Sequence, residues 1–271
     1  MSSSKEQQIK PLPIVKWPGG KRRLSRHILE LFPKNFDCYF EPFMGGGAVF
    51  FSLCPERAVL SDADPDLINC YTQVRDSPER VISRLSQLRN TEEDYYKVRA
   101  SRPRSDTGRA ARLIYLVTLS FNGIYRLNSA GEFNVPYGHK THLRPCDKHR
   151  IKLASAALSK ASITCCDFEL AVAKAKKGDV VYLDPPYTVA HSNNGFLKYN
   201  SKIFSWSDQM RLAGIARQLA SKGCRVIVSN ADHSSILNLY HDFHVARVQR
   251  PSNISANVKF RNAITELLFY I

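Results

Sequence analysis

The segment at residues 36–71 orders a strand, a glycine turn, a helix and a second strand, and this order limits the chain to few folds. FDCYFEPFMGGGAVFFSL reads as strand, turn and helix, and RAVLSDADPDLINCY as a strand that ends near Asp62. Asp64 and Pro65 then suit the N-cap and first turn of the next helix. This unit predicts an open α/β fold with a parallel sheet.

The strand–helix alternation stops and later returns. Residues 76–160 carry helical spacing of apolar residues around an irregular loop, NSAGEFNVPYGHKTHLRP. Strands then recur as ASITCCDF, GDVVYLDPPY and CRVIVSN, with an amphipathic helix at SDQMRLAGIARQLASKG, and FHVARVQR and ITELLFYI suit a closing antiparallel pair. We therefore predict one α/β domain from residues 1–72 and 161–271, interrupted by a mostly helical domain at residues 73–160.

The balance of charges points to a polyanionic partner. The chain of 271 residues has 39 Lys+Arg against 24 Asp+Glu, a net charge of +15, and nucleic acid is the first candidate partner. No stretch approaches the roughly 20 apolar residues that a membrane span needs, and the first ten residues lack an apolar signal core. The seven cysteines form no C-x-x-C pair, which disfavours a disulfide framework or zinc knuckle and fits the cytoplasm.

The glycine turn is a candidate ligand site. Glycine lets a ligand approach the backbone, and the following helix offers N–H groups. Asp62, at the end of the next strand, suits ribose hydroxyls, so the pair predicts an adenosine-type ligand. A dinucleotide fingerprint needs a further glycine where this chain has Phe50, which weakens an NAD oxidoreductase. The alternative is a plain strand-to-helix turn, followed by an Asp that caps the next helix.

Asp184-Pro185-Pro186-Tyr187 follows an apolar strand, so we expect it at the carboxyl edge of the sheet, where open α/β folds bind ligands. Two prolines fix φ and remove two N–H donors. The stiff loop then offers a carboxylate, carbonyls and a ring. This set suits an amino group on a planar heterocycle, with Asp184 and the Pro185 carbonyl each accepting one N–H and Tyr187 stacking on the base. The alternative is a proline-rich turn.

The order and spacing of several segments resemble the DNA adenine-N6 methyltransferases of the Dam type, from about Ile14 to Leu268. This is the class with DPPY, in which the recognition domain lies between the cofactor half and the catalytic half. The matching segments are KWPGGK (16–21), EPFMGGGAVFF (41–51), Asp62, NGIYRLNSAGEFNVPYG (122–138), DPPY (184–187) and VIVSN (226–230). One departure is the turn Gly45-Gly46-Gly47, where the commonest Dam-like form reads G-A-G or G-S-G.

The resemblance implies a Rossmann-like S-adenosylmethionine-dependent methyltransferase sheet. Residues 1–72 and 161–271 are then the catalytic domain and residues 73–160 the target-recognition domain. It also implies S-adenosylmethionine as methyl donor, a flipped adenine in double-stranded DNA as acceptor, direct displacement and no metal. The catalytic residues expected are Asp184, Pro185, Pro186 and Tyr187. The cofactor residues expected are Trp17, Lys21, Glu41, Pro42, Phe43, Gly45, Gly47, Asp62 and Asp184.

Residues 122–128 and 133–136 resemble the recognition hairpin of the Dam enzymes that read GATC, a hairpin shared with relatives that read longer sites containing GAT. Arginine is shaped to read guanine through O6 and N7, so Arg126 is expected to read a guanine, while Ile124 and Pro136 suit a thymine methyl. GATC is a palindrome, so a monomer suffices. Phe121, Asn122 or Tyr125 is expected to fill the gap left by the flipped base. The expected DNA contacts are Asn122, Ile124, Arg126, Asn128 and Pro136 in the hairpin, and Arg247, Arg250, Lys259 and Arg261 in a basic loop.

Other interpretations remain open on the sequence alone. An N4-cytosine or RNA methyltransferase would share the fold and the donor, although N4-cytosine enzymes more often carry Ser in place of Asp184. A non-catalytic DNA-binding relative is a third reading, which the intact DPPY opposes. His139 and His142 have a weak metal-ligand spacing without acidic or cysteine partners, so we expect no metal site there.

Overall fold

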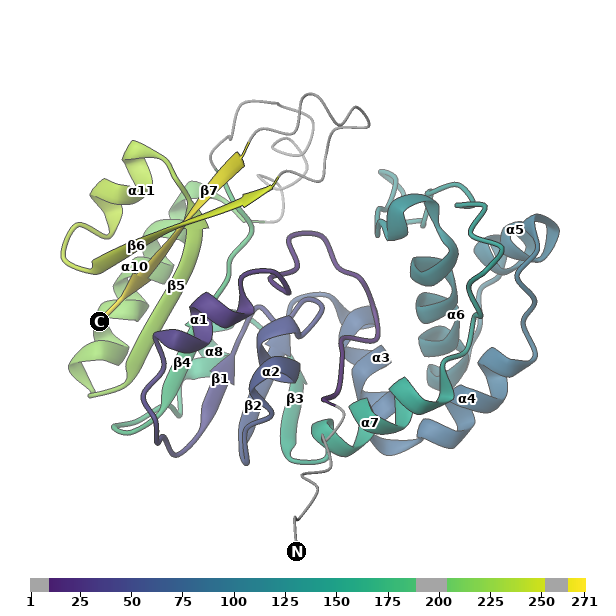
Figure 1. The fold of residues 1–271 in the computed structure, drawn as a ribbon, viewed down its shortest axis with the longest axis horizontal. Coiled ribbons are helices and arrows are strands. Elements are labelled where there is room, and N and C mark those ends of the chain that lie inside the picture. The colour runs from purple at the N-terminus through teal and green to yellow at the C-terminus, as the bar shows by residue number, and fades with distance from the viewer. Residues whose placement is uncertain (1–9, 189–203, 252–262) are drawn as a thin grey trace, which may run out of the picture. The chain divides into compact units, whose positions relative to one another are not determined.

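A computed structural model describes residues 10–188, 204–251 and 263–271 (Figure 1). The chain divides into two compact units. The sheet unit comprises residues 21–44, 55–64 and 161–271, and the helical unit comprises residues 1–20, 45–54 and 65–160. The assignment of target recognition to residues 73–160 stays a prediction.

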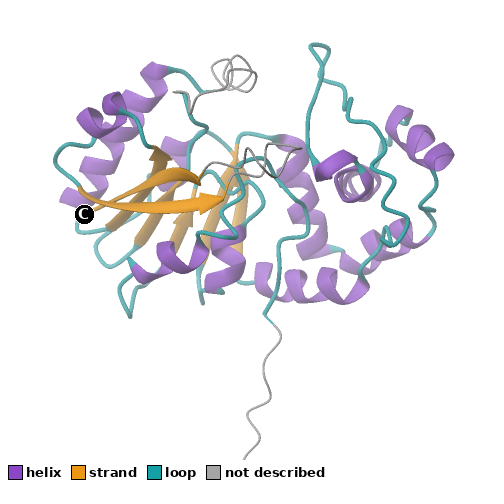
Figure 2. Cartoon of the chain, turned by 45° about the horizontal axis from the view of Figure 1, so that its top comes forward, coloured by secondary structure: helices purple, strands orange, loops and turns teal. Residues whose placement is uncertain are grey.

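The sheet unit contains one seven-stranded mixed sheet, whose strands are drawn in orange in Figure 2. The strand order is β3-β2-β1-β4-β5-β7-β6, and the first five strands in this order are parallel. β7 runs antiparallel to both β5 and β6, which confirms the predicted closing pair. The strands are β1 (Tyr39–Glu41), β2 (Ala58–Asp62), β3 (Ala161–Cys165), β4 (Val180–Leu183), β5 (Arg225–Ala231), β6 (His244–Pro251) and β7 (Ala263–Tyr270). The predicted α/β fold class is confirmed.

The chain reverses its direction across the sheet between β1 and β4. From β1 it proceeds outward to β2 and β3, and it then returns to the other side of β1 as β4. In open α/β sheets, ligands bind outside the carboxyl ends of the strands at such a switch point. The glycine turn follows β1 and DPPY follows β4, so both predicted ligand loops begin at the switch point.

Alternation along the strands gives the sheet two different faces. One face is apolar: Val181, Val226 and Phe269 join one hydrophobic cluster with residues of three helices. The helices are α8 (Phe168–Val172), α10 (Trp206–Ser221) and α11 (Ser234–Leu239), and α1 (Ser25–Glu30) also belongs to this unit. The other face carries the intervening residues, among them Tyr39, Glu41, Tyr182, Ser229 and Glu266, all of which are buried. Polar groups on that face lie close to the loop after β4.

The helical unit confirms the helical interpretation of the inserted segment. α6 is buried along most of its length and packs against α3, α4 and α5. Thr91, Ser105 and Asp147 cap α5, α6 and α7 through their side chains, as residues of these types commonly do. The helices are α2 (Ala48–Leu53), α3 (Pro65–Asp76), α4 (Pro78–Ser86), α5 (Glu92–Ala100), α6 (Asp106–Leu119), η1 (Phe121–Gly123) and α7 (Lys148–Leu158). Among the described residues, no helix combines the length and apolarity that crossing a membrane requires.

Candidate active site and nucleic-acid interface

A buried ion pair fixes the first residue of the DPPY loop. Lys21 Nζ lies 2.9 Å from Oδ1 of Asp184, and the two side chains are 5% and 16% exposed. The same ammonium lies 3.6 Å from Oε2 of Glu266, whose side chain is 1% exposed. Charges in a low-dielectric interior interact strongly with one another, so this cluster restricts the direction of the Asp184 carboxylate.

Lys21 stays charged in this environment. Burial on its own would lower the pKa of Lys21, but Asp184 and Glu266 outweigh it and hold that pKa above its ordinary value of 10.5. Lys21 is therefore a permanent cation at physiological pH and not a proton acceptor. Its predicted contact with a cofactor stays a prediction, whereas its contact with Asp184 is part of the structure.

Tyr187, at the other end of the loop, is held by two groups of the same cluster. Its hydroxyl donates to Oε2 of Glu266 at 2.9 Å. The Nζ of Lys21 lies 4.8 Å from the centroid of its ring, within the range of a cation–π contact. Lys21 thus covers one face of the ring, and the predicted stacking of Tyr187 on a base stays a prediction.

Buried polar side chains support the middle of the loop. Gln209 of α10 donates its amide to the carbonyl oxygen of Pro186 at 3.3 Å and accepts from the amide of Asn230 at 3.1 Å. Tyr182 of β4, two residues before Asp184, shares a hydroxyl hydrogen bond of 2.6 Å with Ser229 of β5. The proline loop is therefore held by a buried network as well as by its own stiffness.

Sequence reasoning missed Glu266, Gln209 and Ser229 as site residues. The signal for Glu266 was present, since it is the one acid within the otherwise apolar strand ITELLFYI. An acid at an inward position of a strand needs a partner, which here is Lys21. Gln209 gave no comparable signal, because a glutamine on an amphipathic helix usually faces solvent.

Three acidic residues lie at or just beyond the carboxyl ends of neighbouring strands. Glu41 ends β1, Asp62 ends β2 and Asp184 follows β4. Glu41 is buried, whereas Asp62 is half-buried and its Oδ1 accepts the backbone N–H of Asp64 at 3.1 Å. Asp62 thus makes a local turn contact just before α3, and both its cofactor role and its role as a helix cap stay predictions.

Phe43, one of the predicted cofactor residues, belongs to an aromatic cluster. Its ring stacks on Phe168 with centroids 5.3 Å apart and meets Phe204 edge-on at 5.6 Å. Arg211 covers the Phe168 ring at 4.2 Å. The carbonyl of Pro42, beside Phe43, accepts the Ser61 hydroxyl at 3.4 Å. These contacts hold the start of the glycine turn.

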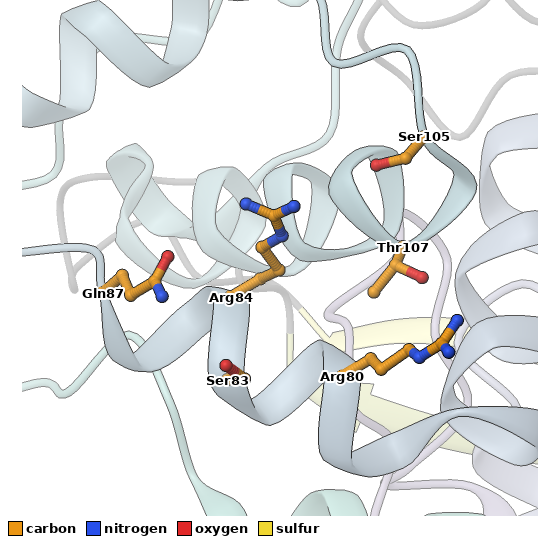
Figure 3. A pocket seen from close by; sticks show the side chains of 6 residues that line it. All are labelled: Arg80, Ser83, Arg84, Gln87, Ser105 and Thr107. Atoms are coloured by element: carbon orange, nitrogen blue, oxygen red, sulfur yellow. The ribbon is translucent and has the colours of Figure 1, made fainter.

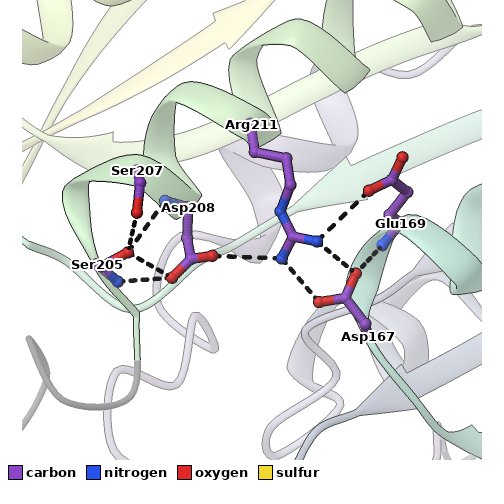
Figure 4. Close-up of polar contacts among 6 residues, drawn as sticks. All are labelled: Asp167, Glu169, Ser205, Ser207, Asp208 and Arg211. Atoms are coloured by element: carbon purple, nitrogen blue, oxygen red, sulfur yellow. Dashed lines mark hydrogen bonds and ion pairs between the residues drawn. The ribbon is translucent and has the colours of Figure 1, made fainter.

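An ion-pair network anchors Arg211 (Figure 4). The guanidinium pairs with Asp167 at 2.8 Å, with Asp208 at 3.3 Å and with Glu169 at 3.4 Å. Asp208 also completes a capping box with Ser205 at the start of α10. The network ties α10 to α8 and fixes the aromatic cluster between them.

The glycines of the turn have a packing reason within the helical unit. Gly45 has φ +48°, and a Cβ placed there would lie 3.1 Å from Cδ1 of Trp17. Gly47, at the N-cap of α2, has φ +66°. Close approach of Trp17 and the left-handed backbone both favour glycine here. Trp17 also stacks on Tyr125 with ring centroids 4.3 Å apart, and its predicted contact with a cofactor stays a prediction.

The predicted recognition hairpin is a compact loop with two isolated bridges, Ser120 to Tyr137 and Leu127 to Phe133. Asn122 adopts a left-handed backbone with φ +52°, and its carbonyl accepts a hydrogen bond from Lys16. Phe121 next to it is 53% exposed, which is unusual for so large an apolar ring.

Arg126 is exposed and directed by a neighbour. Its Nε donates to Oδ1 of Asn134 at 2.8 Å. This bond restricts the plane of the guanidinium, and the predicted contact of Arg126 with a guanine stays a prediction. Asn128 instead serves its own turn, because its Oδ1 accepts the N–H groups of Ala130 and Glu132. Ile124 is half-buried and Pro136 is exposed.

The predicted basic loop was expected to begin at Arg247, and this start is wrong. Arg247 and Arg250 lie within strand β6, because the antiparallel pairing with β7 continues as far as Pro251. Arg247 is 55% exposed, and its Nε lies 3.8 Å from Oδ2 of Asp232. Lys259 and Arg261 lie outside the described residues, so their predicted DNA contacts stay predictions.

The helical unit also contains an open, partly basic cavity of about 550 Å³ between α4 and the start of α6 (Figure 3). Arg80 and Arg84 extend from α4, Thr107 comes from the first turn of α6, and Ser105 directly precedes that helix. Ser105 is already used as the N-cap of α6. None of the residues that line this cavity belongs to the predicted site.

Within the part of the chain that the structure describes, no group of three or more His, Cys, Asp or Glu side chains is arranged to hold a metal ion.

Comparison with known proteins gives consistent matches over nearly the whole chain. Residues 17–254 match the family described as D12 class N6 adenine-specific DNA methyltransferase. The chain is 40% identical to the type II methyltransferase M1.LlaDCHI of Lactococcus lactis, over 99% of this chain and 98% of that protein. It is 35% identical to a DNA adenine methylase of Haemophilus influenzae, over 99% and 98% of the two chains. It is 34% identical to the type II methyltransferase M.MjaIII of Methanocaldococcus jannaschii, over 94% and 97%.

Proposed function

Since this chain belongs to the D12 class N6 adenine-specific DNA methyltransferases, we propose that it takes a methyl group from S-adenosylmethionine and transfers it to an adenine extruded from double-stranded DNA. The buried pair of Lys21 and Asp184 is the observation that carries this proposal. It orients a carboxylate at the carboxyl end of a central parallel strand, where the amino group of a base can donate to it.

Asp184 and the Pro185 carbonyl each accept one N–H of the adenine amino group. These two bonds draw the nitrogen away from conjugation with the ring, so that its lone pair faces the methyl donor. Tyr187 stacks on the base with the ring face opposite Lys21. Holding a reactant in one attack geometry is a large source of rate acceleration.

The residues of the switch point fit S-adenosylmethionine as the donor. The acids Glu41, Asp62 and Asp184 suit a ligand with a sulfonium and an ammonium charge, and the Asp62 carboxylate suits ribose hydroxyls. Phe43 offers an aromatic surface at the start of the glycine turn. When bound, S-adenosylmethionine supplies an electrophilic methyl group.

The transfer needs no covalent link to the enzyme. The amino nitrogen of adenine would attack the methyl carbon in line, so that the N–C bond forms as the C–S bond breaks and S-adenosylhomocysteine leaves. The methylated nitrogen would then give one proton to water. Asp184 stabilises the positive charge that develops on the nitrogen, and Lys21 holds Asp184 in place.

The target adenine must leave the duplex, which costs a few kcal/mol. Tyr187 offsets part of this cost by stacking on the extruded base. Of the three residues expected to fill the vacated gap, Tyr125 is stacked on Trp17, whereas Phe121 is 53% exposed. We therefore assign the filling role to Phe121, with Asn122 supporting it through its left-handed turn.

The proposed target sequence is GATC. Arg126, oriented by Asn134, reads a guanine through two donors. Ile124 and Pro136 supply apolar surface for a thymine methyl. Residues 73–160 act as the target-recognition domain, and residues 1–72 with 161–271 act as the catalytic domain. Since GATC is a palindrome, a monomer methylates both strands in separate visits.

The test is transfer of labelled methyl groups from S-adenosylmethionine to defined substrates. We expect incorporation into duplex DNA with GATC, and little into a duplex in which the GATC adenine is replaced by another base. Matched RNA duplexes should stay unlabelled. Equal labelling of DNA with and without GATC would refute the proposed target, and labelling of RNA alone would refute DNA as the substrate.

A further inference from the structure

Glu266 lies on the same sheet face as the groups below the DPPY loop. The register pairs Tyr182 with Ile227 and Ala231 with Glu266, and residues directly opposite each other share a face. Because side chains alternate, Ile227 and Ala231 also share one face of β5. Glu266 therefore faces the loop from β7, at the far side of β5.

One oxygen of Glu266 reaches two groups of the site. Oε2 accepts the Tyr187 hydroxyl at 2.9 Å and lies 3.6 Å from Lys21 Nζ. Lys21 in turn lies 2.9 Å from Asp184. Asp184 and Tyr187 are the two ends of the DPPY loop, so this chain of contacts links both ends through buried charge.

We infer that Glu266 is a positioning residue that sets the geometry of the acceptor loop, holding Tyr187 directly and Asp184 through Lys21. This inference rests on the proposed roles of Asp184 and Tyr187 in methyl transfer. Glu266 itself contacts neither substrate nor donor in this account. A misplacement of about 1 Å in such a site is enough to cost about 100-fold in rate.

A variant that removes only the charge of Glu266 distinguishes a positioning role of this residue from a purely structural one. Asp184 and Glu266 share the ammonium of Lys21, at 2.9 and 3.6 Å. Glu266→Gln preserves the size of the side chain and leaves Lys21 balanced by Asp184. The substitution also removes the repulsion between two carboxylates that share one ammonium, so this variant should not melt at a lower temperature than the wild type. If Glu266 served only stability, the melting temperature should fall.

The experiment measures single-turnover methylation at saturating DNA and S-adenosylmethionine, together with melting temperature and the affinities for both ligands. Glu266→Leu removes both contacts, and we expect a rate loss of about 10- to 100-fold with affinities within about threefold. Glu266→Gln keeps an acceptor for the Tyr187 hydroxyl, and we expect a smaller loss of about 3- to 10-fold. Tyr187→Phe should slow methylation in the wild-type background. In the Glu266→Leu background the same substitution should lower the rate by less than about a further twofold, because the hydroxyl acts through Glu266.

Asp179→Asn is the matched control. Asp179 is another buried acid of the sheet unit, and its Oδ2 accepts the backbone N–H of Lys176 at the amino end of β4. This variant should melt at a lower temperature without a slower single-turnover rate. Wild-type rates in the Glu266 variants, or a full multiplicative loss in the double variant, would overturn the positioning role.

Failure of the proposed function gives a different result, because the wild type would then be inactive on the same DNA. Crystal structures of the wild type and Glu266→Leu test the inference without activity. If Glu266 positions the loop, the Tyr187 hydroxyl should move by about 1 Å or more in the variant. An unchanged Tyr187 would overturn the inference even if the enzyme were active.

Discussion

The ammonium of Lys21 lies 2.9 Å from a carboxylate oxygen of Asp184, although 163 positions separate the two residues in the sequence. Lys21 follows the Gly-Gly turn of KWPGGK, and Asp184 opens DPPY. Two segments that the sequence suggested separately are therefore parts of one charge cluster. This pairing makes Lys21, the last residue of KWPGGK, a support of the acceptor loop.

Replacing Lys21 by Met should destabilise the fold. The change leaves Asp184 and Glu266 as two like charges in a buried site, and breaking such a pair costs about 3–5 kcal/mol. Urea unfolding measures this loss. Lys152→Met is the control, because Lys152 pairs with Glu79 on the exposed surface and its loss should hardly change the free energy of unfolding. Equal changes in the free energy of unfolding would show that the buried ion pair stabilises the fold no more than an exposed one.

The stabilisation by Lys21 should depend on pH in a defined direction. The folded state raises the pKa of Lys21 above 10.5, so its contribution is complete below that value and is lost as pH rises through the folded pKa. The difference in melting temperature between wild type and Lys21→Met should therefore stay constant from about pH 7 to about pH 10 and shrink only at more alkaline pH. A difference that disappears near about pH 9 would mean that burial dominates and the pKa is lowered.

Long-range pairing explains which parts of the site were missed. Glycine turns, proline loops and strand periodicity are local patterns. They located the glycine turn between β1 and α2, and Asp62 and Asp184 at or just beyond the ends of β2 and β4. The position of β7 between β5 and β6 depends on pairing across the chain. Glu266 reaches Lys21 only because β7 lies between β5 and β6, so no local sequence pattern indicated Lys21 as its partner.

The mistaken start of the basic loop has a similar cause. The two predictions overlap at Arg247 and Arg250, because FHVARVQR alternates as a strand while its two arginines also suit a basic loop. Pairing with β7 extends β6 through Arg247 to Pro251. A proline is tolerated there because β6 is the last strand of the sheet.

Arg126→Ala should relax the target sequence at one position. Removing a bidentate contact to guanine costs about 1–3 kcal/mol of discrimination at that base pair. Methylation rates on duplexes with each GATC position substituted measure the effect. Asn134→Ala, which only frees the guanidinium from its hydrogen bond, should give the same change in weaker form. A uniform decrease at all four positions in Arg126→Ala would instead assign the arginine to a phosphate.

Neutralising Arg247 should weaken DNA binding without changing sequence preference. A lost phosphate contact flattens the slope of log affinity against log salt by about one unit. Fluorescence anisotropy over a salt series measures this slope. Arg217→Ala is a suitable comparison, because its guanidinium is held by Asp242 and Leu239 and should leave the slope unchanged. An unchanged slope in Arg247→Ala would remove β6 from the DNA interface.

The position of the transferred methyl group tests the central claim most directly. GATC duplexes are incubated with S-adenosylmethionine and either the wild type or Asp184→Ala, then digested and separated by mass spectrometry. The account predicts N6-methyldeoxyadenosine with the wild type, and at least about 100-fold less with Asp184→Ala, whose DNA affinity stays within about tenfold. N6-methyldeoxyadenosine formed by Asp184→Ala at the wild-type rate, or a methyl group on cytosine instead of adenine, would contradict it.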